Sequence, residues 1–342
     1  MVEGHQFDAM VMLPGCDKIV PGMIMAAARL DIPAILVPGG PMEAGKYKDL
    51  ENITLTDMRE LIGRMQVGKM DADELAEAET CALPGYGTCA MMGTANSMGC
   101  LAEVLGLTLP CCGTALAVSS EKRLLAKQSG KRIVGMLEEG LTARKILTRQ
   151  TLLNGIKATM AMGASTNTVL HLMAIANEAN VDLCLNDFDA ISRQVPYLCN
   201  IKPSGKYPMA ALHESGGVQG VLKTIESKLD TDQPTANGNT IAANLAKITP
   251  PANDVILPLS APKDAEGGIA VLYGNLAPDG AVVKKSGVKP SMYTFSGRAR
   301  VFHSMEDASF AVSNDMIKQG DVIVIRYEGP KGGPGMREMY LP

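Results

Sequence analysis

The chain has 342 residues, enough for two cores of ordinary size at roughly 100 to 200 residues per domain. Its 32 Lys and Arg residues against 36 Asp and Glu give a formal charge of -4 without a block of like charge, so neither nucleic acid nor an anionic membrane is an expected partner. Residues 1–10 lack a basic stretch followed by an apolar one, and no apolar run approaches the roughly 18 residues of a spanning helix. We therefore expect a soluble, cytoplasmic protein.

The first half of the chain alternates short apolar runs with helical patterns. Residues 7–14 and 32–40 are typical of buried strands, and residues 23–30 between them are typical of a helix. Such a strand-helix-strand unit predicts a parallel sheet, because the helix returns the chain to the end where the first strand began, so that both strands run in the same direction. Apolar residues at three- and four-residue spacing predict further helices at 54–80, 90–106, 119–138, 142–163, 165–179 and 216–228.

The second half is richer in predicted strands. Residues 230–239 are polar and rich in turn formers, which is typical of a linker or a surface loop. Beyond them, 267–287 predicts two strands around a Pro-Asp-Gly turn, 299–304 and 321–329 predict two more, and 305–315 predicts a helix. We predict an α/β domain with a parallel sheet flanked by helices at 1–229, a linker region at 230–253, and a smaller β-rich, barrel-like domain at 254–342.

Eight cysteines in a chain of this length, without a secretory signal, do not predict a disulfide scaffold. Most are expected to be reduced thiols packed as small core residues. Cys16 is the first exception, because Cys16-Asp17-Lys18 places a thiol, a carboxylate and an amine in one turn between two Pro-Gly pairs. These side chains are three possible metal ligands, or one packed thiol and two solvated charges.

Cys89 is the second exception, because small residues lead through it into a predicted amphipathic helix. A helix N-terminus favours a thiolate, which binds iron or attacks an electrophile; the alternative is a thiol packed at a tight helix start. Cys89 lies far from Cys16 in sequence, so only the fold could bring them together.

Two further segments are candidate sites. The loop at 327–339 is a plain surface turn or lets the backbone approach a ligand and aims Glu338 at a cation. Ser165, Thr166 and Asn167 open a predicted helix, where they would act as caps or contact a substrate. The histidines are scattered and predict no catalytic group.

A phosphate-binding loop is disfavoured, although Gly40 to Lys46 has the G-x-x-x-x-G-K spacing. Tyr47 stands where the loop needs a Ser or Thr hydroxyl for magnesium, and Pro41 removes a backbone donor. An ordinary glycine-rich connection is the better interpretation, with a nucleotide-binding enzyme left as an alternative.

Five segments together closely resemble the dihydroxy-acid dehydratase and sugar-acid dehydratase family. They are LPGCDKIVPGMIMAAARLDIPAILVPGGPM, GTANSMGCLAEVLGLTLP, ASTNTVLHLMAIA, GGIAVLYGNLAPDGAVVK and YEGPKGGPGMREM. The resemblance runs through essentially the whole chain in order, and the cysteine-aspartate-lysine turn is among its most specific signatures. The stretch GNLAPDGAVVK favours the branch of the family that serves branched-chain amino-acid biosynthesis.

The resemblance implies two metal sites. Cys16 and Cys89 match two of three thiolate ligands of an iron-sulfur cluster, expected as [2Fe-2S], and thiolates suit a thiophilic metal. Asp17, Lys18 and Glu338 match ligands of a magnesium ion, the lysine after carbamylation. The carbamate is physically coherent, because magnesium repels an ammonium but prefers an anionic oxygen donor.

The implied reaction is loss of water from a small 2,3-dihydroxy acid to give a 2-keto acid through an enol, with the cluster as Lewis acid. The resemblance also implies a homodimer for the full-length enzyme. An aldonic (sugar) acid dehydratase and a non-catalytic scaffold of the same fold are the alternatives.

In the family, a further cluster cysteine and a magnesium carboxylate lie upstream of residue 1, and the base serine lies downstream of Pro342. No catalytic residue is therefore assigned within this chain. We expect an internal fragment that lacks both ends, with a truncated β-rich domain, and that is inactive alone.

Overall fold

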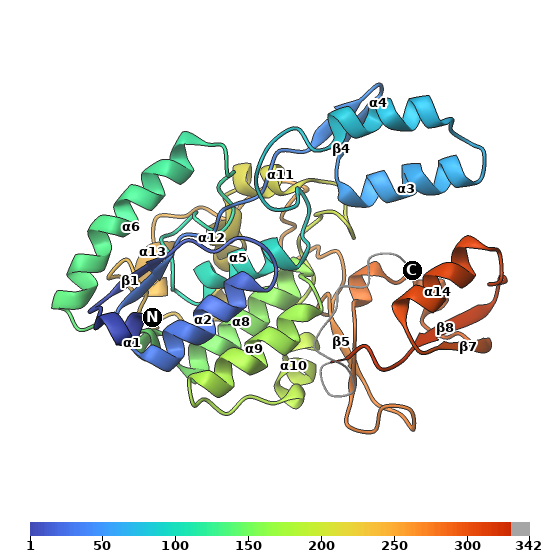
Figure 1. The fold of residues 1–342 in the computed structure, drawn as a ribbon. Helices are drawn as coiled ribbons and strands as arrows, with labels where there is room; N and C mark the ends of the chain where they lie inside the picture. The colour runs from blue at the N-terminus through green and yellow to red at the C-terminus, as the bar shows by residue number, and fades with distance from the viewer. Residues whose placement is uncertain (330–342) are drawn as a thin grey trace. The chain divides into compact units, whose positions relative to one another are not determined.

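The computed structural model describes residues 1–329, and the chain divides into two compact units, Met1–Gly287 and Val288–Pro342. Both units combine helices with two-stranded sheets, so the fold is mixed α/β (Figure 1). The helices are α1 Val2–His5, α2 Ile19–Leu30, α3 Leu55–Gln66, α4 Ala72–Ala82, α5 Thr94–Val104, α6 Ser120–Glu138, α7 Ala143–Ile146, α8 Arg149–Met162, α9 Asn167–Glu178, α10 Leu185–Ser192, α11 Met209–Glu214, α12 Gly217–Thr224, α13 Ile241–Leu245 and α14 Met305–Ser313. The strands are β1 Met10–Met12, β2 Ala34–Leu36, β3 Gly45–Tyr47, β4 Leu50–Ile53, β5 Ala270–Leu272, β6 Ala281–Val283, β7 Arg298–Phe302 and β8 Asp321–Ile325.

The predicted strand-helix-strand unit is confirmed. β1 and β2 pair in parallel, with Val11 opposite Ile35, and α2 is the crossover between them. All three residues of β2 are buried, which explains its uninterrupted apolar sequence. The turn that carries Cys16 follows β1 and leads into α2, so it lies at the carboxyl end of the parallel pair.

The core of the first unit is built around α5. Residues Ala95–Val104 are all buried, and α5 packs on α2, α8, α9 and α12. Glycines allow the close approach: a Cβ added at Gly155 of α8 would lie 3.2 Å from a methyl group of Leu105. The helix is buried on every side, although it carries the polar residues Asn96, Ser97 and Glu103.

A small lobe is inserted between β2 and α5 (Figure 1). The antiparallel hairpin β3–β4 and the helices α3 and α4 form it, and they share a separate core that includes Tyr47, Ile53 and Leu61. The prediction of one helix over 54–80 was wrong, because Gly68 adopts a left-handed conformation (φ 70°) and Asp71 caps a new helix by accepting a bond from the Glu74 amide at 2.7 Å.

The segment at 230–253, predicted as a linker region, lies within the first unit. Ala236 and Leu245 are fully buried there, and α13 lies within the segment. Strands β5 and β6 pair antiparallel and β7 and β8 pair in parallel; the described part of 254–342 contains no closed barrel. The barrel-like form and the predicted domain limits stay predictions.

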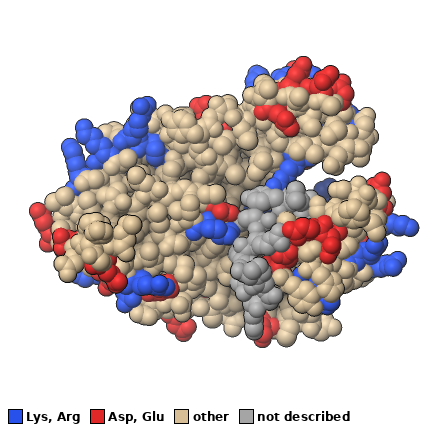
Figure 2. Space-filling view, in the orientation of Figure 1, with Lys and Arg blue, Asp and Glu red and all other residues tan. Residues whose placement is uncertain are grey.

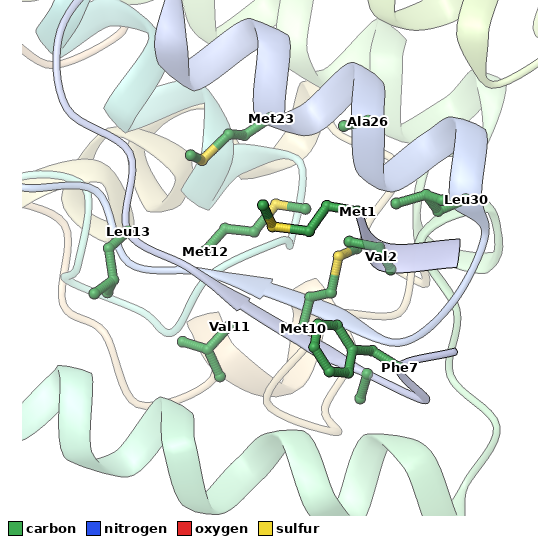
Figure 3. Close-up of a pocket in the computed structure, with 11 residues that line it drawn as sticks. Met1, Val2, Phe7, Met10, Val11, Met12, Leu13, Met23, Ala26 and Leu30 are labelled. Atoms are coloured by element: carbon green, nitrogen blue, oxygen red, sulfur yellow. The ribbon is translucent and has the colours of Figure 1, made fainter. Parts of the chain in front are cut away.

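An apolar pocket of about 810 Å³ lies beside β1, lined by residues from α1, β1 and α2 (Figure 3). Figure 3 shows Val11 pointing to the side of β1 opposite Met10 and Met12, as strand geometry requires.

On the face drawn in Figure 2 both signs of charge occur, with basic side chains gathered over α6. Among the helices of residues 1–329, none has the length and apolar character to cross a membrane.

Two glycines make a matched test of this packing. Gly163 has φ 60°, and an added Cβ would lie 2.4 Å from the ring of Tyr197, so Gly163→Ala is expected to lower the free energy of unfolding by about 2 kcal/mol or more. Gly130, in exposed α6, has no atom within 4 Å of an added Cβ, so Gly130→Ala is expected to raise it by about 0.5 kcal/mol. Urea midpoints of both variants measure the difference; equal shifts would contradict the packing described at Tyr197.

Candidate functional site

The turn at residues 14–18 connects β1 to α2. Cys16 is exposed and has φ 71°, a left-handed conformation that costs about 1 kcal/mol for a residue with a Cβ. Its thiol lies 3.4 Å from Asp17 Oδ1, and Lys18 Nζ lies 3.4 Å from Asp17 Oδ2. The amide of Gly39, after β2, donates to the carbonyl of Pro14 at 2.9 Å. The two parallel strands therefore bring their carboxyl ends together at this turn, where ligands bind in open α/β sheets.

Cys89 is half-buried in the loop before α5. The prediction that it opens the helix was wrong, because α5 begins at Thr94 with Gly93 as its N-cap. Burial raises the pKa of the Cys89 thiol, and negative charge at Cys16 and Asp17 raises it further. The helix dipole therefore does not activate this thiol as the sequence suggested.

One pocket of about 590 Å³ brings the two cysteines together. Its lining residues are Gly15, Cys16, Ile19, Gly39, Met42, Tyr86, Gly87, Thr88, Cys89, Ala95 and Ala117. Small residues on this wall leave room beside two soft sulfur donors, which is the chemistry that a thiophilic metal needs. In the described part of the chain, no group of three or more His, Cys, Asp and Glu side chains is arranged to hold a metal ion.

His171 of α9 is a neighbour that the sequence did not single out. It is buried, and its Nε2 has no hydrogen-bond partner among the described residues. Burial lowers the pKa of His171 to about 4, and the positive charge of Lys18 lowers it further while Asp17 opposes this. A neutral imidazole therefore stands beside the turn of Cys16. The packing of α9 against α2 brings His171 near this turn, and the sequence alone does not indicate that packing.

Ser165, Thr166 and Asn167 lie where α9 begins, at the N-terminus of α5 rather than on the pocket of the cysteines. Ser165 Oγ lies 2.8 Å from Thr94 Oγ1, and Asn167 Nδ2 donates to the same Thr94 oxygen at 2.8 Å. Thr166 is the N-cap of α9, but its side chain makes no capping bond. These residues join α9 to α5, and substrate contact stays a prediction.

A buried lysine holds the chain just before this triplet. Lys284, at the end of β6, donates to the carbonyls of Gly163 and Ala164 at 2.8 and 3.0 Å. Burial lowers the pKa of Lys284 to about 8. These carbonyls follow α8, so Lys284 holds the turn that leads from α8 to α9. The stretch GNLAPDGAVVK marked the segment, but not this contact.

Glu338 lies outside the described residues. The G-x-x-x-x-G-K spacing at 40–46 leads into the hairpin β3–β4 and not into a helix, and Lys46 pairs with Glu51 at 2.6 Å. This segment therefore lacks the helix N-terminus that cradles a phosphate.

Residues 1–244 match the family model described as Dihydroxy-acid/6-phosphogluconate dehydratase N-terminal, and residues 254–342 match its C-terminal counterpart. The chain belongs to this dehydratase family.

Its relatives include proteins named dihydroxy-acid dehydratase. Those of Methanosphaera stadtmanae and Carboxydothermus hydrogenoformans are each 49% identical to the chain, and that of Methanobrevibacter smithii is 47% identical. Each alignment covers 100% of this chain and 62% of the relative. The chain thus spans less than two thirds of the length of these relatives.

Proposed function

We propose that the chain forms the metal-binding part of a dehydratase that converts a 2,3-dihydroxy acid into a 2-keto acid, in branched-chain amino-acid biosynthesis. The observation that carries the proposal is the pocket shared by Cys16 and Cys89, next to Asp17 and Lys18. The names of the relatives that align over the chain support the substrate class.

The donor set fits two kinds of metal. Cys16 and Cys89 would bind the iron of a [2Fe-2S] cluster, because thiolates are the usual ligands of such clusters. Asp17, Lys18 as its carbamate, and Glu338 would bind Mg²⁺ through oxygen. The Lys18 side chain is 38% exposed, so carbon dioxide can reach its amine. Its neutral amine would attack the carbon of carbon dioxide, and the proton released as the N–C bond forms would pass to solvent.

Metals bound at these donors would supply positive charge for the departing C3 hydroxyl and for the substrate carboxylate. The chain itself would orient the substrate: the turn at Cys16 and the loop at Cys89 fix the two walls of the pocket. Ile19, Met42 and Ala117 would keep water out on the apolar side. We assign no proton-abstracting base within this chain. Glu338 would belong to a barrel-like domain of 254–342, and the full-length enzyme would form a homodimer.

The test uses a version of the chain extended to the full length of its relatives. Purified and reconstituted with iron, sulfide and Mg²⁺, it is expected to form 2-keto acid from a branched 2,3-dihydroxy acid faster than from an aldonic acid. Faster turnover of the aldonic acid would move the proposal to the sugar-acid branch. Visible absorbance without turnover of either acid would contradict the dehydratase proposal.

In that full-length version, Cys89→Ser is expected to lose most of its bound iron while keeping its fold, because the lost bond is to the metal and not to the core. Iron content, visible absorbance and circular dichroism measure the effect. Cys184→Ser is the matched control, since Cys184 is an exposed thiol outside the pocket. Iron content equal to that of the control would show that Cys89 is not a ligand.

Lys18→Arg in the full-length version is expected to reduce dehydration by about 100-fold or more, because a guanidinium keeps the positive charge but cannot form the carbamate. Lys46→Arg, at an exposed lysine paired with Glu51, is the control. Mass spectrometry of the Lys18 peptide is not suited to a labile carbamate, so the measurement is activity with and without added bicarbonate. An active Lys18→Arg variant would leave the lysine a structural role only.

The 342-residue chain on its own is expected to hold no stable cluster and to show no dehydratase activity. Its described pocket offers two thiols, and each missing ligand leaves iron and sulfide more open to solvent. The measurement is iron and acid-labile sulfide after anaerobic reconstitution and gel filtration. One cluster per chain with sustained keto-acid formation would contradict this expectation.

A further inference from the structure

The side chain of Asn96 lies at the centre of the hydrogen bonds that hold the Cys89 loop. Asn96 is in the first turn of α5 and is 2% exposed. Its Nδ2 donates to the carbonyls of Cys89 and of Met91, the second at 2.7 Å. Its Oδ1 accepts from the hydroxyl of Thr88 at 2.6 Å. One buried amide therefore binds Cys89 itself, Thr88 before it and Met91 two residues after it.

The orientation of this amide follows from its partners. Two carbonyl oxygens can only accept, so both protons of Nδ2 must face Cys89 and Met91. The flipped amide would place Oδ1 against those two oxygens and leave both carbonyls without this donor. Three of the four hydrogen bonds available to an amide are thus made in one arrangement, which is costly to lose in a buried site.

The rest of the loop is tied to other parts of the first unit. The amide of Thr88 donates to Gly40 at 2.9 Å, and the amide of Met92 donates to the carbonyl of Lys202 at 2.8 Å. These bonds fix the loop where it enters and leaves the pocket wall. Between them, Asn96 holds the peptide of the cysteine.

We propose that Asn96 is a positioning residue that fixes the Cys89 thiol on the wall it shares with Cys16, with Thr88 as its partner. The metal-ligand consequence rests on the function proposed above, but the position of the thiol does not. With the amide in place, Cys89 presents its sulfur from a preset loop, so a metal would bind without paying to order that loop.

Two variants distinguish the contribution of the Asn96 amide from that of the Thr88 hydroxyl. Asn96→Ala leaves the buried carbonyl of Cys89 without this donor and frees the peptide that carries the thiol. Thr88→Val keeps nearly the same shape and removes the bonds of the Thr88 hydroxyl to Asn96 Oδ1 and to the carbonyl of Gly40 at 3.1 Å. Both bonds from Asn96 Nδ2 stay in place, so its effect is expected to be smaller. If Asn96→Ala lowers the yield of folded chain, Thr88→Val still tests the proposal.

Asn154 provides the matched control. It is also a buried asparagine in a helix of the first unit, and it also holds a loop: Nδ2 donates to the carbonyl of Asp230 at 2.7 Å, and Oδ1 accepts from the Asp230 amide at 3.0 Å. Asn154→Ala therefore loses a comparable pair of bonds without touching the Cys89 loop.

The readout is the rate at which iodoacetamide alkylates Cys89 in the metal-free 342-residue chain. Cleavage after Glu79 and Glu103 places Cys81, Cys89 and Cys100 in one peptide, and fragment spectra separate them. Cys81 is half-buried in α4 and serves as the reference rate, and buried Cys100 reports whether the core stays closed.

Asn96→Ala is expected to raise the Cys89 rate relative to Cys81 by about tenfold, and Thr88→Val by about threefold, because local opening of the loop exposes the half-buried thiol to the reagent. Cys100 is expected to stay protected throughout. An unchanged Cys89 rate in Asn96→Ala, or an equal rise in Asn154→Ala, would overturn the proposal.

Iron retention then separates this proposal from the function. In the reconstituted full-length version, Asn96→Ala is expected to lose iron on dilution about tenfold faster than Asn154→Ala. A faster alkylation with unchanged iron retention would support the positioning role of Asn96 and contradict the ligand role of Cys89.

Discussion

The burial of α5 is the constraint on which the described site depends. Its residues Ala95–Val104 have no exposed face, so the helix can move only if the surrounding core moves. Asn96 and Thr94, at its N-terminus, carry the contacts to the Cys89 loop and to Ser165. A rigid central helix therefore serves as the reference that places two segments far apart in sequence.

Packing on the same helix explains how the turn at Cys16 can carry an exposed thiol in a defined position. The turn at Cys16 has a left-handed residue and an exposed thiol, which would be poorly defined if left to itself. It is fixed because α2 begins at Ile19 and packs against α5 and α9. At this turn the left-handed residue and the exposed thiol face the pocket, while the apolar contacts behind them provide the stability.

Local sequence signals were sufficient to predict the β1–β2 sheet, because apolar runs on either side of α2 define both strands without any long-range information. They failed where a short turn interrupts a helical pattern: Gly68 and Asp71 split one predicted helix into α3 and α4. For the candidate site, the residue types of Cys16 and Cys89 suggested soft-metal chemistry, but their meeting on one pocket depends on tertiary packing. Asn96 gave no signal, because an asparagine in the first turn of a helix is ordinary until its partners are known.

The insertion of the small lobe has a mechanical consequence for the pocket. The two connections of the lobe, at Met42 and at Gly87–Thr88, are hydrogen-bonded to each other and are also part of the pocket wall. Lys202 adds a strut, because its ammonium binds Asp57 of α3 at 2.8 Å while its carbonyl holds Met92 of the Cys89 loop. The connections of the lobe and the wall of the pocket therefore share the same backbone, so a displacement of the lobe would be transmitted to the wall beside Cys89.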